Sequence, residues 1–511
     1  MRYFSTCLAI LLFCLDAYHS QAQDSLSYFE KETAKMAVKR TVLEDYYNNP
    51  ANKVDYSSFS YSDFFVDWQQ EQKNVYEKQE GNKNKGMGIH THSFQKLDST
   101  TSIWGKASYV NQEQSGVSWN SGLDFDKIRP YVMADSTIAT NKFQSYAFEG
   151  GYAKELKKWQ LGALLNYQAN MGYRTRDPRP KSISSDINLK LGLGYALHKN
   201  WTADTYALLS KYTQNTSVKF ANEVQQASLY QMQGLGTWNS YFSNKTTEIA
   251  FEELGYQIGL NIAKNQTKDF VIGASLGRYN LNKLIFSSVG TNDGGDDLNT
   301  LKKEQAKIYA LKTFQWKQHQ WGLKWQTELN KHTGTDILYS NNDKYLIRLM
   351  EKENYRWEDN SHTLEGFYSF TAPTYSLSVT PYFEYQRTTE LLKETAIAQK
   401  FHYQYLGLRA NYYQKIDYKS AFRFSPTLRY RNVFKSTNDL QIETRKESIR
   451  EWLNHDFKYN STNYIHWGAA ASYQFQPSNF PVVYLTLDWS SIQFTTKETN
   501  QDINLSLGII F

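Results

Sequence analysis

The sequence has almost no cysteine. Its two cysteines, Cys7 and Cys14, both lie within the first 15 of 511 residues. Beyond that point the chain can form no disulfide, no thiolate metal site and no cysteine nucleophile. Long apolar runs are also missing after this region, so no stretch approaches the roughly 20 apolar residues that a helical membrane span needs.

Low hydropathy and scarce proline occur together with many aromatic residues. Mean hydropathy is −0.65, and the chain has only 9 prolines but 39 tyrosines and 13 tryptophans. Disordered chains lack aromatics, so this composition excludes disorder. A transmembrane β-barrel fits, because its strands alternate lipid-facing apolar residues with polar lumen residues and its aromatics form interfacial girdles. The net charge of +6 is only mildly basic and does not indicate nucleic-acid binding.

The first residues predict export. Arg2 is a short positive region, Tyr3 to Leu15 is almost continuously apolar, and Ser20 and Ala22 are small residues before a cleavage site. This is the pattern of a secretory signal peptide, which we expect to span residues 1–22. The bulky residue before Cys14 and the short apolar stretch upstream of it disfavour a lipoprotein signal.

Alternation of apolar and polar residues, the signal of a strand with two different faces, recurs from about Gly86. Several alternating segments exceed ten residues, as a tilted membrane crossing requires. The clearest example sets one apolar series against interleaved polar or small residues. The apolar series is Ile187, Leu189, Leu191, Leu193, Tyr195 and Leu197.

Short and long polar connections alternate along the same region. Lys157-Lys158 and His198 to Asn200 are short, whereas Arg174 to Ser184 and Lys219 to Lys245 are long. Tight periplasmic turns and long outer loops are typical of outer-membrane barrels. We therefore predict an all-β fold, a transmembrane antiparallel β-barrel of about 16–18 strands with a short N-terminal periplasmic segment. An even number of strands places both ends of the chain in the periplasm.

The expected boundary separates residues 23–85, a periplasmic segment, from residues 86–511, the barrel. Leu26 to Tyr47 is charged and has helical spacing. Asn48-Asn49-Pro50 breaks any helix there, because proline lacks a donor and clashes with the preceding turn. Ser58 to Trp68 can be either a first barrel strand or a short inner strand.

The last ten residues form one more alternating segment. Ile503, Leu505, Leu507 and Ile509 share a face that ends in the terminal Phe511. An apolar-alternating last strand with a terminal phenylalanine resembles the assembly signal of bacterial outer-membrane proteins. We therefore expect the barrel assembly machinery to be a partner.

Several segments resemble an uncharacterised family of outer-membrane β-barrels from Bacteroidetes, known by a domain-of-unknown-function label. They are residues 102–109, 129–136, 145–152 and the Tyr-Arg-x-x-Asp-Pro-Arg-Pro-Lys motif at 173–181. The specific motifs cover roughly residues 85–220, and the likeness downstream is mainly the barrel pattern. The resemblance implies an outer-membrane location and a genomic association with TonB-dependent uptake genes. It implies no catalytic residue.

A basic cluster lies in a predicted outer loop or strand rim. It contains Arg174, Arg176, Arg179 and Lys181, with two prolines that stiffen the loop. Arginines offer bidentate donors to carboxylate or phosphate, so the cluster can contact anions, including lipopolysaccharide phosphates. The favoured alternative is a structural turn whose arginines pair with neighbouring acids.

A second basic set lies on one predicted strand. Because Phe422, Phe424, Leu428 and Tyr430 share the opposite face, we expect the basic residues to project into the lumen, where rings of charge tune selectivity. The equally weighted alternative is internal ion pairing with lumen acids such as Glu328. The set consists of Arg423, Arg429 and Arg431.

Metal and catalytic patterns are weaker. His90 and His92 share a strand face but have no identifiable third ligand. Asp293 to Asp297 is rich in carboxylates but lacks the spaced glutamate of an EF-hand. No spacing singles out a nucleophile with its base. We therefore predict no catalytic residue, no metal and no cofactor.

The leading functional hypothesis is a non-enzymatic diffusion channel, or an accessory component of a TonB-dependent nutrient uptake system. The runner-up is a closed-lumen binding or structural barrel acting through its outer loops, especially Lys219 to Lys245 with Trp238, Tyr241 and Phe242. A barrel enzyme ranks third. The residues before Gly86 are too few for a TonB-receptor plug, but they can occlude the pore partly or dock a periplasmic partner. Expected partners are outer-membrane lipid, lipopolysaccharide, and a TonB-dependent receptor or surface lipoprotein.

Overall fold

The computed structural model describes most of the chain. The described ranges are 28–198, 200–222, 227–244, 246–264, 267–286, 295–342, 345–440, 446–478 and 480–511. The predicted signal peptide, residues 1–22, lies outside these ranges.

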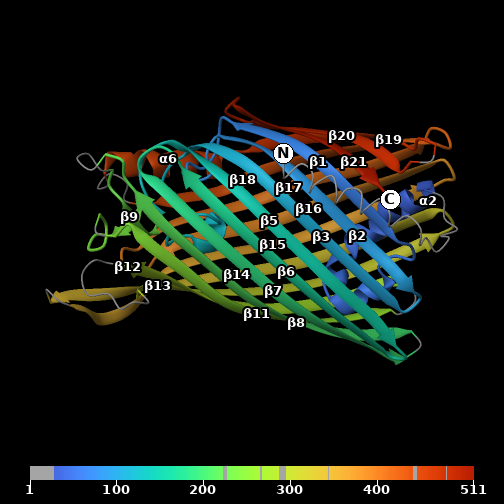
Figure 1. Ribbon diagram of the computed structural model, residues 1–511, viewed down its shortest axis with the longest axis horizontal. Helices are drawn as coiled ribbons and strands as arrows, with labels where there is room; N and C mark the ends of the chain where they lie inside the picture. The colour runs from blue at the N-terminus through green and yellow to red at the C-terminus, as the bar shows by residue number, and fades with distance from the viewer. Residues whose placement is uncertain are drawn as a thin grey trace, which may run out of the picture.

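Within the described residues, eighteen antiparallel strands form one closed barrel (Figure 1). Each strand pairs with the next barrel strand along the chain, and the first pairs with the last to close the sheet. The all-β prediction is confirmed, with a strand number at the upper end of the expected range. The strands are β1 (Tyr61–Lys73), β2 (Lys83–Asp98), β3 (Thr101–Val117), β5 (Ala139–Leu156), β6 (Trp159–Arg174), β7 (Arg179–His198), β8 (Trp201–Lys219), β11 (Glu248–Lys264), β12 (Phe270–Phe286), β13 (Asp296–Trp316), β14 (His319–Asn342), β15 (Tyr345–Thr371), β16 (Tyr375–Leu392), β17 (Ile397–Lys415), β18 (Ser420–Asp439), β19 (Tyr464–Phe475), β20 (Val482–Phe494) and β21 (Thr499–Ile510).

The outer face of the barrel carries the apolar half of each alternating strand. On β7, Ile187 and Leu191 are 41% and 53% exposed, whereas the neighbouring Gly192 is buried. The same arrangement recurs around the barrel, for example at Leu260 on β11 and Leu276 on β12. A continuous band of exposed apolar side chains on a closed sheet is stable only against lipid.

The two ends of the barrel differ in the length of their connections. Two-residue turns such as Lys157-Lys158 lie at the end where β1 begins and β21 finishes. Long connections, such as the one between β3 and β5, lie at the opposite end. By the general rule for such barrels, the short turns face the periplasm and the long loops face the exterior.

The barrel begins earlier in the sequence than expected. β1 starts at Tyr61 and pairs with both β2 and β21. The boundary expected at residue 86 therefore moves to Tyr61, and the segment Ser58 to Trp68 supplies the first barrel strand rather than an inner one. Alternation in β1 is lost after Trp68, where polar residues occupy both faces, and this explains the misplaced boundary.

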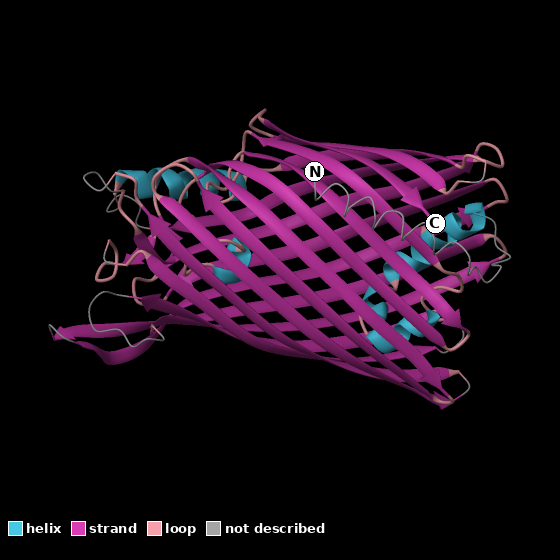
Figure 2. Cartoon of the chain, in the orientation of Figure 1, coloured by secondary structure: helices cyan, strands magenta, loops and turns pink. Residues whose placement is uncertain are grey.

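Residues 28–60, here called the N-terminal segment, lie inside the barrel near its periplasmic end (Figure 2). The helical stretch predicted over Leu26 to Tyr47 is interrupted, and the turn at Pro50 follows it as expected, with Asn49 accepting a hydrogen bond from the Ala51 N–H at 3.0 Å. The short helices contact β12 and β15, and the 3₁₀ turn contacts β5, β6 and β7. They are α2 (Tyr28–Lys35), α3 (Val38–Val42), α4 (Glu44–Tyr47) and η2 (Pro50–Asp55).

Three connections at the outer end fold together into what is here called the cap, residues 118–138, 227–244 and 446–463. A small sheet of order β10-β9-β4 joins the first two connections, and a 15-residue helix forms most of the third (Figure 2). Among the described residues, no helix is long and apolar enough to span a bilayer. The cap elements are α5 (Phe125–Ile128), β4 (Met133–Ala134), β9 (Tyr230–Gly234), β10 (Thr237–Asn239) and α6 (Glu447–Ser461).

Candidate functional site

The cap has an apolar core that also contacts the barrel wall. Trp119 stacks on Trp452 of α6, with ring centroids 4.9 Å apart and planes 13° apart. Burial of aromatic rings of this size stabilises a loop more than turn geometry alone can. The wall contributes residues from β8, β11, β12, β13, β15, β16 and β17. The cap therefore packs across the outer mouth of the barrel. Its buried apolar residues include Ile128, Tyr131, Val132, Met133, Leu229, Met232, Leu235, Phe242, Ile449 and Leu453.

A buried ion pair fastens the first cap connection to the wall. Arg174, the last residue of β6, donates from Nη1 to Oδ2 of Asp135 at 3.0 Å, and both side chains are 0% exposed. The same guanidinium donates to Asn141 Oδ1 at 3.1 Å and to the Asn120 carbonyl. Arg174 therefore has no surface with which to contact an outside anion, and the alternative of pairing with a neighbouring acid holds for this residue.

Of the other three residues in the predicted rim cluster, one forms an ion pair and two are exposed to solvent. Arg179 Nε lies 2.8 Å from Asp177 Oδ1, and the other oxygen of Asp177 accepts the backbone N–H groups of Ala221 and Asn222. Arg176 and Lys181 are exposed. Anion contact by these last two residues stays a prediction.

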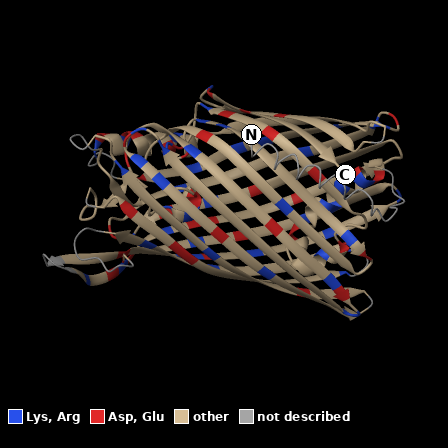
Figure 3. Cartoon of the chain, viewed as in Figure 1, with Lys and Arg blue, Asp and Glu red and all other residues tan. Residues whose placement is uncertain are grey.

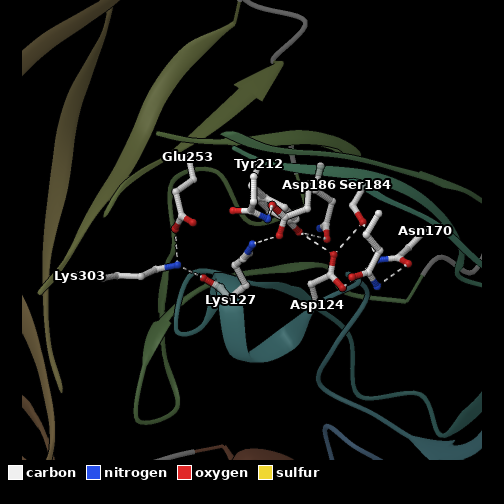
Figure 4. A network of polar contacts seen from close by, with 11 residues as sticks. Asp124, Lys127, Asn170, Ser184, Asp186, Tyr212, Glu253 and Lys303 are labelled. Carbon is white, nitrogen blue, oxygen red and sulfur yellow. Dashed lines mark hydrogen bonds and ion pairs between the residues drawn. The ribbon is translucent and has the colours of Figure 1, made fainter. Parts of the chain in front are cut away.

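A polar network ties α5 to the wall below the apolar core (Figure 4). Lys127 pairs with Asp186 of β7. Lys303 of β13 donates to the Lys127 carbonyl at 2.6 Å and pairs with Glu253 of β11. The loop thereby receives direct polar contacts from β7 and β13, and Glu253 of β11 supports the lysine of β13.

A carboxylate on the same loop extends the network. Asp124 accepts hydrogen bonds from Tyr212 Oη at 3.0 Å and from Ser184 Oγ at 2.7 Å. Asn170 Nδ2 donates to both Asp124 and Ser184 at 3.2 Å. Buried polar groups that satisfy one another in this way fix a single arrangement of the loop.

The aromatic residues of the Lys219 to Lys245 loop point into the cap. Phe242 is 2% exposed, and Trp238 and Tyr241 pack against the apolar core. The expectation that all three residues hold an outside partner is wrong for Phe242, because its side chain is buried in the cap core. A loop sequence shows aromatic residues without showing the other loops that bury them.

The three strand arginines lie on the lumen side of β18, since Phe424, Leu428 and Tyr430 are exposed on its outer face. Arg431, only 4% exposed, donates to the carbonyl oxygens of Tyr459 and Thr462 at 2.7 and 2.6 Å. It thereby holds the C-terminal end of α6, where free carbonyl groups favour a cation.

The other two arginines make fewer fixed contacts. Arg429 lies 3.9 Å above the Tyr405 ring and 3.5 Å from Glu384, and Arg423 donates to Ser425 Oγ at 3.1 Å. Glu328, the acid expected to pair with this set, pairs instead with Lys307 at 2.8 Å. Internal ion pairing therefore accounts for Arg429, while Arg431 is held by backbone carbonyl oxygens instead of an acid. A role of the set in selectivity stays a prediction.

A cavity of about 490 Å³ lies beneath the cap. Its walls come from the β1–β2 connection, the cap, and the lumen faces of β15 to β19. Two carboxyl groups meet at its edge: Glu77 accepts from Asn460 Nδ2 at 2.8 Å, and Asp456 accepts from the Lys78 N–H at 2.9 Å. Burial, reinforced by Asp456, raises the pKa of Glu77 to about 7, and burial raises the pKa of Asp456.

The N-terminal segment is fastened to the lumen by charge. Asp45 of α4 lies 2.6 Å from the Nζ atoms of both Lys307 and Lys324. Burial alone would raise the pKa of Asp45, but the two lysines lower it below its ordinary range. At the next turn, Asn49 donates to Asp204 Oδ1 of β8 at 2.7 Å. These contacts hold the segment inside the lumen, and it does not extend as a free tail into the periplasm.

The histidines that share a strand face have local partners. His90 Nε2 lies 2.7 Å from Asp67 Oδ1 and its ring stacks on Phe65, while His92 packs edge-on against Tyr61. Within the described ranges, no three histidine, cysteine, aspartate or glutamate side chains gather as a metal site would require. The acidic stretch Asp293 to Asp297 lies partly outside the described residues.

These features define the class of protein. A closed barrel of eighteen strands with an exposed apolar band, short turns at one end and long loops at the other is an outer-membrane β-barrel. The chain belongs to a family of unknown function, DUF6850, whose model matches residues 50–511. A search of curated proteins finds no match.

Solved structures similar to this chain include bacterial uptake receptors. The ferric yersiniabactin uptake receptor FyuA from Yersinia pestis has a TM-score of 0.42 at 7% identity, over 88% of this chain and 80% of that one. The ferric preacinetobactin receptor BauA from Acinetobacter baumannii has a TM-score of 0.38 at 8% identity, over 89% and 80%. The ferric-catecholate import receptor Fiu from E. coli K12 has a TM-score of 0.38 at 9% identity, over 90% and 85%.

Proposed function

We propose that this protein is a non-enzymatic, non-conducting outer-membrane barrel that acts through its folded cap, as the surface-binding accessory of a nutrient uptake system. The observation that carries the proposal is the cap itself, whose apolar core crosses the outer mouth and is fastened by the buried Arg174–Asp135 pair. A packed core in this place would block an open diffusion channel. The N-terminal segment, held by Asp45, obstructs the lumen a second time.

The proposed partners follow from the two faces of the cap. Its inner face packs on the wall and borders the enclosed cavity, so a TonB-dependent receptor or a surface lipoprotein would meet the outer face. The resemblance to a Bacteroidetes barrel family associated with such uptake genes supports this choice. The terminal strand β21, which Phe511 directly follows, pairs with β1 and supports recognition by the barrel assembly machinery.

Gated transport is the second candidate, and the cavity beneath the cap favours it. A space of about 490 Å³ is large enough for a small solute. It lies under the obstruction that would have to move for passage. In this alternative the cap is a gate, and the cavity is the first chamber behind it.

Single-channel conductance in planar bilayers tests the proposal. The refolded barrel, shown to be folded by heat-modifiable gel mobility, should give no steady conductance. Trp119→Ala removes the stack on Trp452, and together with Asp45→Asn, which loosens the N-terminal segment, it should produce brief openings. Trp321→Ala on the outer face, combined with Asp45→Asn, should not. Steady conductance of the unmodified barrel would refute the non-conducting role. Openings triggered by an added solute would favour gated transport.

A further inference from the structure

A row of charged residues crosses four strands on the outer face, just above the apolar band. Arg278 on β12 lies opposite Glu304 on β13, Glu304 lies opposite Lys331 on β14, and Lys331 lies opposite Glu358 on β15. Directly opposed residues share one face of a sheet. Arg278 follows the exposed Leu276 by two positions, which places the row on the lipid-facing side and toward the outer end.

The acids of this row pair with basic residues that lie two positions farther toward the outer end on the same strands. Glu304 pairs with Lys302, and Glu358 pairs with Arg356. Among the described residues, neither Arg278 nor Lys331 has an ion pair within 4 Å. Two cations therefore face outward with their neighbouring carboxylates already engaged. Other acidic and basic residues are spread along the strands rather than gathered in one patch (Figure 3).

A groove of about 510 Å³ lies directly beside these two cations. The row below them runs from Leu276 through Ala306 to Leu329, and the small alanine between two leucines forms the floor of the groove. The leucines are 67% and 43% exposed. The site thus combines two cations on its outer side with an apolar floor on its membrane side.

We propose that this groove binds lipopolysaccharide, with a phosphate on Arg278 and Lys331 and an acyl chain along Ala306. The cations lie two strands apart, about 10 Å at ordinary strand spacing, a separation that lets both reach one phosphorylated headgroup. Arginine binds phosphate through a bidentate fork and lysine as a point charge. The long-loop end of the barrel faces the outer leaflet, which lipopolysaccharide fills, so we choose this lipid over a phospholipid.

Binding of purified lipid to the refolded full barrel in detergent tests the site. Native mass spectrometry would compare lipid A carrying its phosphates, the same lipid after dephosphorylation, and phosphatidylglycerol. Because each surface cation contributes about 1 kcal/mol, Arg278→Gln/Lys331→Gln should weaken binding of phosphorylated lipid A about thirtyfold. The matched control, Lys157→Gln/Lys317→Gln, removes two exposed cations from the turns at the opposite end.

A second pair of variants tests the groove without changing charge. Ala306→Phe fills the floor and should weaken binding, whereas Ala310→Phe, four residues away on the same outer face, should not. Unchanged affinity in both groove and cation variants would overturn the proposal. Equal loss in the control variants, equal binding of dephosphorylated lipid, or equal binding of phosphatidylglycerol would overturn it as well. Gel mobility confirms that each variant is folded, and none of these outcomes depends on conductance.

Discussion

Replacing Arg174 should loosen the cap without unfolding the barrel. In Arg174→Met, a side chain of similar length fills the space but leaves the Asp135 carboxylate buried without its cation. Breaking a buried pair by removing one partner costs about 3–5 kcal/mol. Asp135 keeps hydrogen bonds from Ser121 Oγ at 3.0 Å and from the Thr137 N–H at 2.9 Å. These remaining donors place the expected cost near 3 kcal/mol, at the lower end of that range.

Native-state hydrogen exchange measures this cost where it is expected. Amides of residues 118–138 that exchange through opening of the cap should do so about a hundredfold faster in the variant, since 1.4 kcal/mol corresponds to a factor of ten. Amides in the middle of β6 should keep their protection, because the ladder of backbone hydrogen bonds there does not involve the cap.

The matched control is Arg176→Met, which removes the same charge two residues away from an exposed position. It should leave exchange in the cap unchanged. Arg174→Met/Asp135→Leu should recover part of the lost protection, because no buried charge then remains unpaired. If Arg174→Met left cap exchange as slow as in the original chain, the ion pair would not be what fastens the loop.

Three further perturbations address the other contacts. Asp45→Asn should destabilise the docked N-terminal segment by about 1–3 kcal/mol. The measurement is the rate of proteolysis of residues 28–60 from the periplasmic side, which should rise. Glu328→Gln, which leaves Asp45 in place, should have a smaller effect. Glu77→Gln should abolish a loosening of the cap as pH rises toward about 7, measured by hydrogen exchange from pH 5 to 8. Arg431→Met should destabilise α6, seen as faster exchange of its amides, whereas Arg423→Met should not, because the Arg423 guanidinium donates to Ser425 on its own strand and not to α6.

Strand patterns can be predicted because lipid imposes them locally. The alternation from Ile187 to Leu197 follows from one face meeting acyl chains and the other meeting the lumen, and β7 has this arrangement. Connection lengths predict the strand number to within two. Where polar residues occupy both faces, as near Trp68 in β1, the local pattern weakens and the expected barrel boundary falls too late in the chain.

The cap could not be predicted, because its contacts join residues distant in sequence. Trp119 and Trp452 belong to different connections, one between β3 and β5 and the other between β18 and β19. The sequence places Arg174 in a basic cluster, but its partner Asp135 is 39 residues away in an irregular loop. A basic loop looks the same in sequence whether its arginines face water or a buried acid.

The two obstructions of the lumen should respond to pH in opposite directions. The pKa of Asp45 is lowered in the folded state, so its contribution is present above the ordinary carboxyl range and is lost as pH falls below about 4. The pKa of Glu77 is raised to about 7, so the contribution of its protonated form is present at low pH and is lost as pH rises through about 7. Mild acid therefore keeps both the cap and the N-terminal segment in place. Raising the pH through about 7 loosens the outer obstruction first, and lowering it below about 4 loosens the periplasmic one first. Conductance measured across this range would therefore show which obstruction controls the pore.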